Sequence, residues 1–327
     1  MKAKKIGSSL LLTLTALIWG VAFVAQSVGM DHVGPYTFNA ARFIIGGVVL
    51  LPVVAIFSKK KVNAASVRIG IIGGVCCGAC LSVASSLQQV GILYSDSVGK
   101  VGFITSLYII IVPLLGIFMG KKVSVNVWIS VLIAAAGMYL LCFADSFLQP
   151  GDSLLLQADG GGGSGGFSLQ PGDLLVLLCA VGFSVHILVI DYFSPKADGV
   201  LISCIQFFVA GFVCTVLTVL FEKPSMENIL AAKGPILYAG VLSSGVGYTL
   251  QVVAQKQIEP TVASLLMSLE SVFSVIAGVF LLEQLLSAAE LLGCVLVFAA
   301  IVLAQLPYQA WKEGQRPAVG EVRPDMK

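Results

Sequence analysis

The sequence carries very little charge. Asp, Glu, Lys and Arg make up only 11% of its 327 residues, and 57% of the residues are hydrophobic; soluble domains carry about 25% charged residues. A soluble fold could not cover so much apolar surface with so few charges. This excludes an ordinary cytosolic enzyme, a nucleic-acid-binding protein and a disordered chain. We therefore expect an all-α integral membrane protein.

Histidine is scarce too, with only His32 and His186 in the chain. The sequence has no His-Glu-x-x-His pattern, which excludes that type of zinc protease site. It also has no Gly-Lys-Ser/Thr phosphate loop, so we expect no direct drive by ATP. We expect no cofactor and no metal. The expected partners are a small-molecule substrate and the lipid bilayer, with no nucleic acid and with a homodimer left open.

The cysteines do not form the pattern of an extracellular disulfide framework, because all eight lie inside apolar runs. Cys77 and Cys80 have the spacing of a redox pair. They share their apolar run with Gly70, Gly74 and Gly78, and small residues at that spacing let helices approach closely. We interpret these cysteines as small packing residues.

Long apolar runs recur along the whole chain. A membrane-spanning helix needs about 20 mostly apolar residues, and a window of about 19 residues identifies candidates. The first run follows a basic start that resembles a signal peptide, but no small-x-small cleavage site follows it, so we expect it to be retained. Ten spans are predicted, over residues 8–28, 36–57, 69–90, 98–119, 123–143, 173–192, 199–221, 235–254, 261–282 and 286–306.

The distribution of Lys and Arg predicts the orientation, because cytoplasmic loops are enriched in both. With the N-terminus inside, the outer loops hold only Lys223 and Lys233, and Arg42 and Lys100 fall within spans. The other fifteen of the 19 basic residues are then cytoplasmic. An even number of spans with both termini in the cytoplasm fits this bias.

The chain also resembles itself when it is shifted by about 163 residues. Leu87-Gln88 then falls on Leu250-Gln251, and Glu270 falls on Leu107. A shift one residue longer places Arg42-Phe43 on Gln206-Phe207. Each copy holds five spans, an odd number, so the second copy enters the membrane from the opposite side. Transporters built this way bind substrate near the midplane between the two copies.

The two copies are joined by a segment rich in glycine. We expect 1–143 to be the first five-helix repeat, 144–172 a flexible extracytoplasmic linker, and 173–306 the second repeat. The polar segment 307–327 is expected to be a cytoplasmic tail.

Several short stretches resemble one transporter family. Leu17-Ile18-Trp19-Gly20, the stretch from Tyr94 to Tyr108, and Ser268-Leu269-Glu270-Ser271-Val272 are similar in order and spacing to motifs of EamA-type members of the drug/metabolite transporter superfamily. Ser271 stands where the family motif has proline. The resemblance implies a ten-helix transporter of amino acids or other small metabolites, and many such members are exporters.

Polar side chains at membrane depth are functional candidates, because they are costly there unless paired or hydrated. Glu270 is the strongest candidate, as a proton carrier or a partner for a substrate amine. Arg42 could bind a carboxylate, although it could instead extend to the interface. Lys100 lies only two or three residues inside its predicted span, so extension to the interface is the stronger interpretation, with a functional role as the alternative. Each candidate has a structural alternative, namely hydrogen bonding between helices. The remaining candidates are Trp19, Gln88, Tyr108, His186, Tyr248 and Gln251.

Three classes of function compete. A secondary transporter that works by alternating access agrees best with the repeats. A passive channel or facilitator would need a continuous polar stripe along several helices, and the polar residues are scattered. A membrane-embedded enzyme would need a cluster of acids, histidines or an activated nucleophile, which the sequence does not show. We therefore expect a transporter and no enzyme.

Overall fold

The computed structural model describes residues 2–57, 63–94, 98–121, 123–148, 171–282 and 288–305. In these ranges every regular element is a helix. The elements are α1 (Lys2–Met30), α2 (Pro35–Phe57), α3 (Ala64–Leu93), α4 (Val98–Ser106), α5 (Tyr108–Phe118), α6 (Val125–Leu148), α7 (Pro171–Phe193), α8 (Gly199–Phe221), α9 (Met226–Ala231), α10 (Lys233–Leu237), the π-helix η1 (Tyr238–Tyr248), α11 (Thr249–Ala254), α12 (Pro260–Met267), α13 (Leu269–Leu282) and α14 (Ala288–Gln305).

Seven helical stretches in the described residues are long and apolar enough to cross a membrane. Two shorter apolar helices, Val125–Leu140 and Leu291–Ala304, add to them. Each of the ten predicted ranges is helical over most of its length. The seven stretches are Lys5–Met30, Pro35–Ile56, Ala64–Leu93, Val101–Phe118, Pro171–Phe193, Gly199–Phe221 and Lys233–Ala254.

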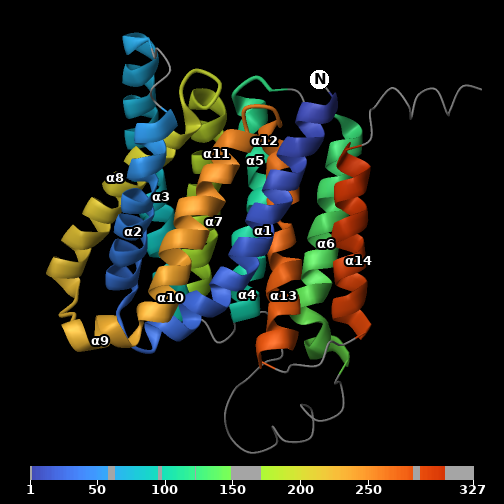
Figure 1. The fold of residues 1–327 in the computed structure, drawn as a ribbon. Helices are drawn as coiled ribbons and strands as arrows, with labels where there is room; N and C mark the ends of the chain where they lie inside the picture. The colour runs from blue at the N-terminus through green and yellow to red at the C-terminus, as the bar shows by residue number, and fades with distance from the viewer. Residues whose placement is uncertain are drawn as a thin grey trace, which may run out of the picture.

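The helices form one bundle in which the first half of the chain packs against the second half. α2 packs along α8, α3 packs against both α7 and α8, and α1 packs against α13 and η1. α6 and α14 pair at one edge of the bundle (Figure 1). The start of α1 and the end of α14 lie at the same end of the bundle (Figure 1), as an even number of passes requires.

Two of the ten predicted spans are interrupted near their middles. The first breaks at Leu107, between α4 and α5, and the second breaks at Ser268, between α12 and α13. Pro113, which the sequence suggested as a kink, lies inside α5, beyond the break. The sequence shift of about 163 residues paired Leu107 with Glu270. The positions of the two interruptions instead pair Leu107 with Ser268.

Close packing of small residues was predicted for α3 and is confirmed. A Cβ atom on Gly78 would lie 2.7 Å from the carbonyl oxygen of Gln206 in α8, which is too close to be tolerated. Cys77 is buried, and Cys77 and Cys80 are both free thiols. Gly78 therefore lets α3 approach α8 closely, and Cys77 packs in a buried apolar cluster.

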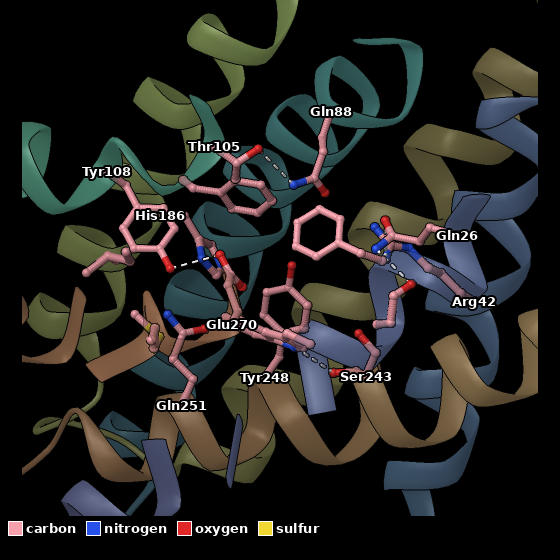
Figure 2. A pocket seen from close by; sticks show the side chains of 16 residues that line it. Gln26, Arg42, Gln88, Thr105, Tyr108, His186, Ser243, Tyr248, Gln251 and Glu270 are labelled. Atoms are coloured by element: carbon pink, nitrogen blue, oxygen red, sulfur yellow. Dashed lines mark hydrogen bonds between the residues drawn. The ribbon is translucent and has the colours of Figure 1, made fainter. Parts of the chain in front are cut away.

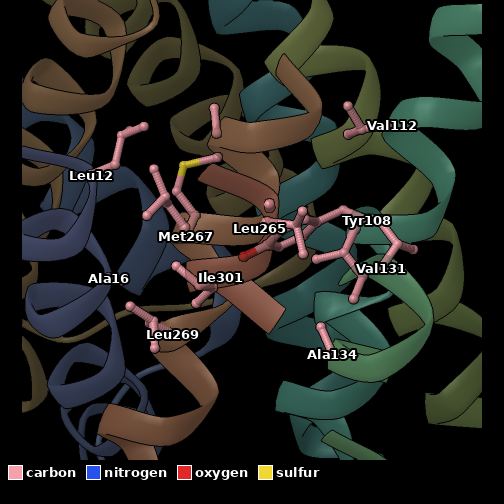
Figure 3. Close-up of a cluster of buried hydrophobic side chains, with 14 of the residues drawn as sticks. Leu12, Ala16, Tyr108, Val112, Val131, Ala134, Leu265, Met267, Leu269 and Ile301 are labelled. Atoms are coloured by element: carbon pink, nitrogen blue, oxygen red, sulfur yellow. The ribbon is translucent and has the colours of Figure 1, made fainter. Parts of the chain in front are cut away.

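The largest apolar cluster fills the space between α1, α5, α6, α12 and α14 (Figure 3). Leu12 of α1, Val131 of α6 and Leu265 of α12 are fully buried in it. This cluster lies against the two interruptions, because Tyr108 and Leu269, which follow them, both belong to it. It gives the interrupted segments a rigid backing.

Polar contacts join the two halves at both ends of the bundle. Lys121, after α5, forms an ion pair with Asp191 of α7. At the opposite end, the Glu222 carboxylate accepts hydrogen bonds from the backbone N–H groups of Tyr36 and Thr37, each at 2.8 Å. That carboxylate satisfies N–H groups in the first turn of α2, which otherwise lack helical partners.

α6 continues to Leu148 and α7 begins at Pro171, so both helices extend into the range 144–172 that was predicted as the linker. Gly172 makes a tight contact there, since a Cβ atom on it would lie 2.5 Å from the carbonyl oxygen of Tyr94. Residues 149–170 and the tail from 306 onward lie outside the described residues.

Candidate functional site

A narrow cavity lies in the middle of the bundle, between helices of both halves (Figure 2). It leaves about 40 Å³ of room for water-sized molecules, which is enough for only a few waters. Its walls are lined by Trp19, Ala22, Phe23, Gln26, Arg42, Gln88, Thr105, Tyr108, Phe183, His186, Ile187, Ser243, Tyr248, Gln251, Met267 and Glu270.

Glu270 reaches the cavity from the first turn of α13, just after the interruption at Ser268. Its side chain is 5% exposed, and its Oε1 atom accepts a 2.9 Å hydrogen bond from the Tyr108 hydroxyl. Tyr108 begins α5 directly after the other interruption. Beside this pair, the hydroxyl groups of Ser106 and Ser271 are 2.8 Å apart. The two interruptions thus bring polar groups of both halves together at the cavity wall.

Arg42 reaches the cavity from α2 and is only 2% exposed. Its guanidinium carbon lies 4.6 Å from the centre of the Phe43 ring, and its Nη1 atom donates a 3.4 Å hydrogen bond to Gln26 Oε1. The Nε and Nη2 atoms find no hydrogen-bond partner within the described ranges. No described carboxylate lies within ion-pair distance of this guanidinium. A buried charge without a counter-ion is costly, so this arrangement favours an anionic ligand.

Aromatic rings separate the two charged groups. Trp19 and Tyr248 lie with their ring centres 4.5 Å apart, and Figure 2 shows Tyr248 between Arg42 and Glu270. The Trp19 indole N–H donates to the Ser243 carbonyl oxygen at 3.2 Å. Ser243 lies in the π-helix η1. π-Helical segments inside membrane and soluble helices are frequent at functional sites.

The remaining predicted polar residues also line the cavity. Gln88 donates a 3.3 Å hydrogen bond to the Thr105 hydroxyl, whereas the Oε1 atom of Gln251 is buried without a partner. His186 is 1% exposed, and its Nε2 atom lies 3.1 Å from Gln206 Oε1. The histidine is therefore both a cavity wall and a partner in a helix–helix contact.

Comparison with known proteins identifies the family. Residues 7–143 and 170–306 each match the EamA-like transporter family. The chain belongs to the EamA-like transporter family. An uncharacterized transporter of Archaeoglobus fulgidus is 26% identical over 304 residues, which cover 93% of this chain and 87% of the relative. The uncharacterized transporter YoaV of Bacillus subtilis is 23% identical over 295 residues, which cover 88% of this chain and 92% of that relative.

A solved crystal structure shares the fold, with a TM-score of 0.70 at 19% identity. The superposition covers 94% of this chain and 99% of that one. Together with the long apolar helices, the family membership makes this chain a multi-pass membrane transporter with two EamA repeats. A transporter family also agrees with the expectation that the chain is no enzyme.

Eight of the nine residues that the sequence singled out in this EamA-like transporter line the one cavity. The ninth, Lys100, has a side chain outside the described part of the structure. Sequence reasoning missed Gln26, Thr105 and Ser243. Gln26 carried the usable signal, because it is an amide near the end of an apolar run. Ser and Thr are common in membrane helices and gave no comparable signal.

Proposed function

We propose that this protein is a secondary transporter that exports a small amino acid or a related metabolite across the cytoplasmic membrane by alternating access. In this proposal ten helices cross the membrane as two inverted five-helix repeats, 1–143 and 173–306. Both termini and the tail 307–327 face the cytoplasm, and the segment 144–172 faces outward. The substrate binds between the repeats at the central cavity, which holds only a few waters in this structure and has to widen as the repeats move.

One observation carries the proposal. The cavity offers an unpaired buried cation, Arg42, and a buried acid, Glu270, on opposite sides of Tyr248. A guanidinium suits a carboxylate and a glutamate suits an ammonium group. An amino acid carries both groups, so its main-chain atoms match the polarity of the cavity. Inverted-repeat transporters place their substrate sites near the midplane, between repeats.

Glu270 is also the natural candidate for coupling to protons. It is the only carboxylate among the residues that line the described cavity. Its hydrogen bond from Tyr108 joins the two halves at their interruptions, so a change in its protonation acts where the halves meet. Proton relays in transporters commonly use buried acids of this kind.

Transport by purified protein in proteoliposomes tests the proposal. Vesicles are loaded with single amino acids from a panel, and their exit is measured with and without an imposed pH gradient, against protein-free vesicles. We expect one or a few amino acids to leave faster, and against their own gradient when protons flow inward. Movement only down the gradient would favour a passive facilitator, and no movement of any amino acid would overturn the substrate class.

Cysteine labelling tests the orientation. In a cysteine-depleted background, a thiol at Gly163→Cys is expected to react with a membrane-impermeant reagent added outside the cell. Labelling from the cytoplasmic side alone would reverse the proposed topology.

A further inference from the structure

The Arg42 guanidinium is buried, and no carboxylate in the described part of the chain serves as the counter-ion that buried charges usually have. Two of its three nitrogen atoms have no hydrogen-bond partner among the described residues. The aromatic rings of Phe38 and Phe43 lie 6.0 and 4.6 Å from its guanidinium carbon. Rings of this kind attract a cation weakly and cannot replace a carboxylate.

Among the residues that the structure describes, Gln26 is the one polar side chain bonded to this guanidinium. Gln26 is 4% exposed and lines the cavity. Its Oε1 atom accepts from Arg42, and its Nε2 atom donates to the Ala22 carbonyl oxygen at 3.3 Å, one turn earlier in α1. The second bond fixes which end of the amide faces Arg42. The amide therefore orients the guanidinium without neutralising it.

Glutamate has the shape of glutamine, and at this position it would form an ion pair with Arg42 inside the protein. We propose that Gln26 is a specificity-determining residue, because its neutral amide positions Arg42 and leaves the positive charge free for a carboxylate ligand. The inference rests on the proposed function for its substrate. The anion subsite itself requires only Arg42, Gln26 and the cavity beside them.

Gln26→Glu tests this inference, because it changes the charge while keeping the shape. The probe is sodium formate, a carboxylate small enough for a cavity that holds only a few waters. The purified protein is melted in detergent with formate or with chloride at equal ionic strength. A ligand that binds only the folded state raises the melting temperature. We expect formate to raise it for the wild type and to have no specific effect on Gln26→Glu.

The melting temperature without ligand shows whether the side chain at position 26 pairs with Arg42 or only fills space. Without ligand, Gln26→Glu should melt at or above the wild-type temperature, because its new carboxylate pairs with Arg42. Gln255→Glu is the matched control. Gln255 is also buried and donates from Nε2 to a carbonyl oxygen, that of Ile187 at 3.2 Å, but it does not line the cavity. We expect this control to melt lower, because its carboxylate gains no cation, and to keep the formate response.

Transport adds a comparison that uses the substrate. For the amino acid that the wild type moves best, we expect Gln26→Glu to raise KM at least about tenfold, the effect of one lost charged contact. The same variant should discriminate less between that amino acid and its decarboxylated amine. Gln26→Met removes the positioning bond but adds no carboxylate, so its KM should rise less.

The outcomes separate the inference from the proposed function. If the wild type shows no formate-specific stabilisation, or if Gln26→Glu retains it, the anion subsite is wrong. If Gln26→Glu melts as low as Gln255→Glu, no ion pair forms and the inference is also wrong. If formate stabilises only proteins with Gln26 while no amino acid is transported, the subsite stands and the proposed substrate class fails.

Discussion

The two halves of the chain contribute opposite charges to the cavity they share. The first half supplies Arg42, and the residue aligned with it in the second half is the neutral Gln206. The second half supplies Glu270, and the first half meets it with the neutral Tyr108. The two EamA repeats thus pack alike but differ in charge at the site. The cavity is therefore electrostatically asymmetric, with the basic side chain of Arg42 at one end and the acidic side chain of Glu270 at the other.

Neutral positions remain closer to symmetric. Phe43 and Phe207, which align in the two halves, stack on each other with their ring planes 15° apart. Gln88 and Gln251, a second aligned pair, both line the cavity. Packing is therefore shared between the halves, whereas charge is not. We infer that the charges were selected for the ligand, because a symmetric scaffold does not require them.

Removing the acid should produce the largest effect. Glu270→Gln keeps the size of the side chain and the hydrogen bond from Tyr108, but it removes the titrating group. Loss of one partner of a buried charged contact costs about 2–5 kcal/mol, which is a fall of about 30-fold or more in transport efficiency. The measurement is the initial rate of efflux from proteoliposomes between pH 5.5 and 8.5. We expect the remaining transport to lose its dependence on pH.

Tyr108→Phe is the control for that experiment. It removes the 2.9 Å hydrogen bond and leaves the carboxylate in place. Its rate should fall about tenfold or more, the worth of one hydrogen bond to a charged group, while the pH dependence remains. A Glu270→Gln protein with the wild-type rate and pH profile would leave Glu270 with a structural role only.

Removing the cation should have the next largest effect and a different signature. Arg42→Lys keeps the charge but loses the planar, two-pronged donor. We expect KM for the amino acid to rise about tenfold, the worth of one good hydrogen bond, with little change in maximal rate. KM and maximal rate are measured in the same vesicles, with protein insertion checked by gel filtration. A change confined to the maximal rate would contradict a role in binding substrate.

The sequence alone predicted much of this site, for a simple physical reason. Polar side chains in apolar runs avoid lipid, so Trp19, Arg42, Glu270 and the others had to face the interior. In a bundle with one central cavity, most interior polar groups meet there. Sequence could not show which of them would bond to each other. The Tyr108–Glu270 bond depends on the two helix interruptions. These occur at a leucine and a serine, Leu107 and Ser268, and not at a glycine or proline that would have predicted a break.

The π-helix η1 was not predicted either, because its residues fit an ordinary helical run. Its consequence appears only in three dimensions. The carbonyl oxygens of Ser243 and Gly247 in η1 accept hydrogen bonds from Trp19 and Thr15 of α1. These bonds fasten α1 to the backbone of η1 at the cavity wall. Because the acceptors are backbone atoms, the pattern of side chains does not predict these contacts.

The smallest predicted effects come from the aligned glutamines, and they should differ in kind. Gln88 already has a partner in Thr105, whereas the Gln251 oxygen faces the cavity without one. Replacing Gln88 by methionine, which keeps the volume, removes a hydrogen bond that joins α3 to α4. Such a bond is worth about 1 kcal/mol, so the melting temperature should fall by about 2 °C with little change in KM.

Gln251→Met should behave in the opposite way. It removes a buried acceptor that has no protein partner, so the melting temperature should stay the same or rise slightly. If the substrate ammonium binds at the Glu270 end, this oxygen is available to it, and KM should rise about threefold to tenfold when it is lost. Melting temperature and KM are measured on both variants side by side. Equal effects of the two substitutions on both quantities would show that the glutamines are equivalent, and the asymmetry of the cavity would then be confined to Arg42 and Glu270.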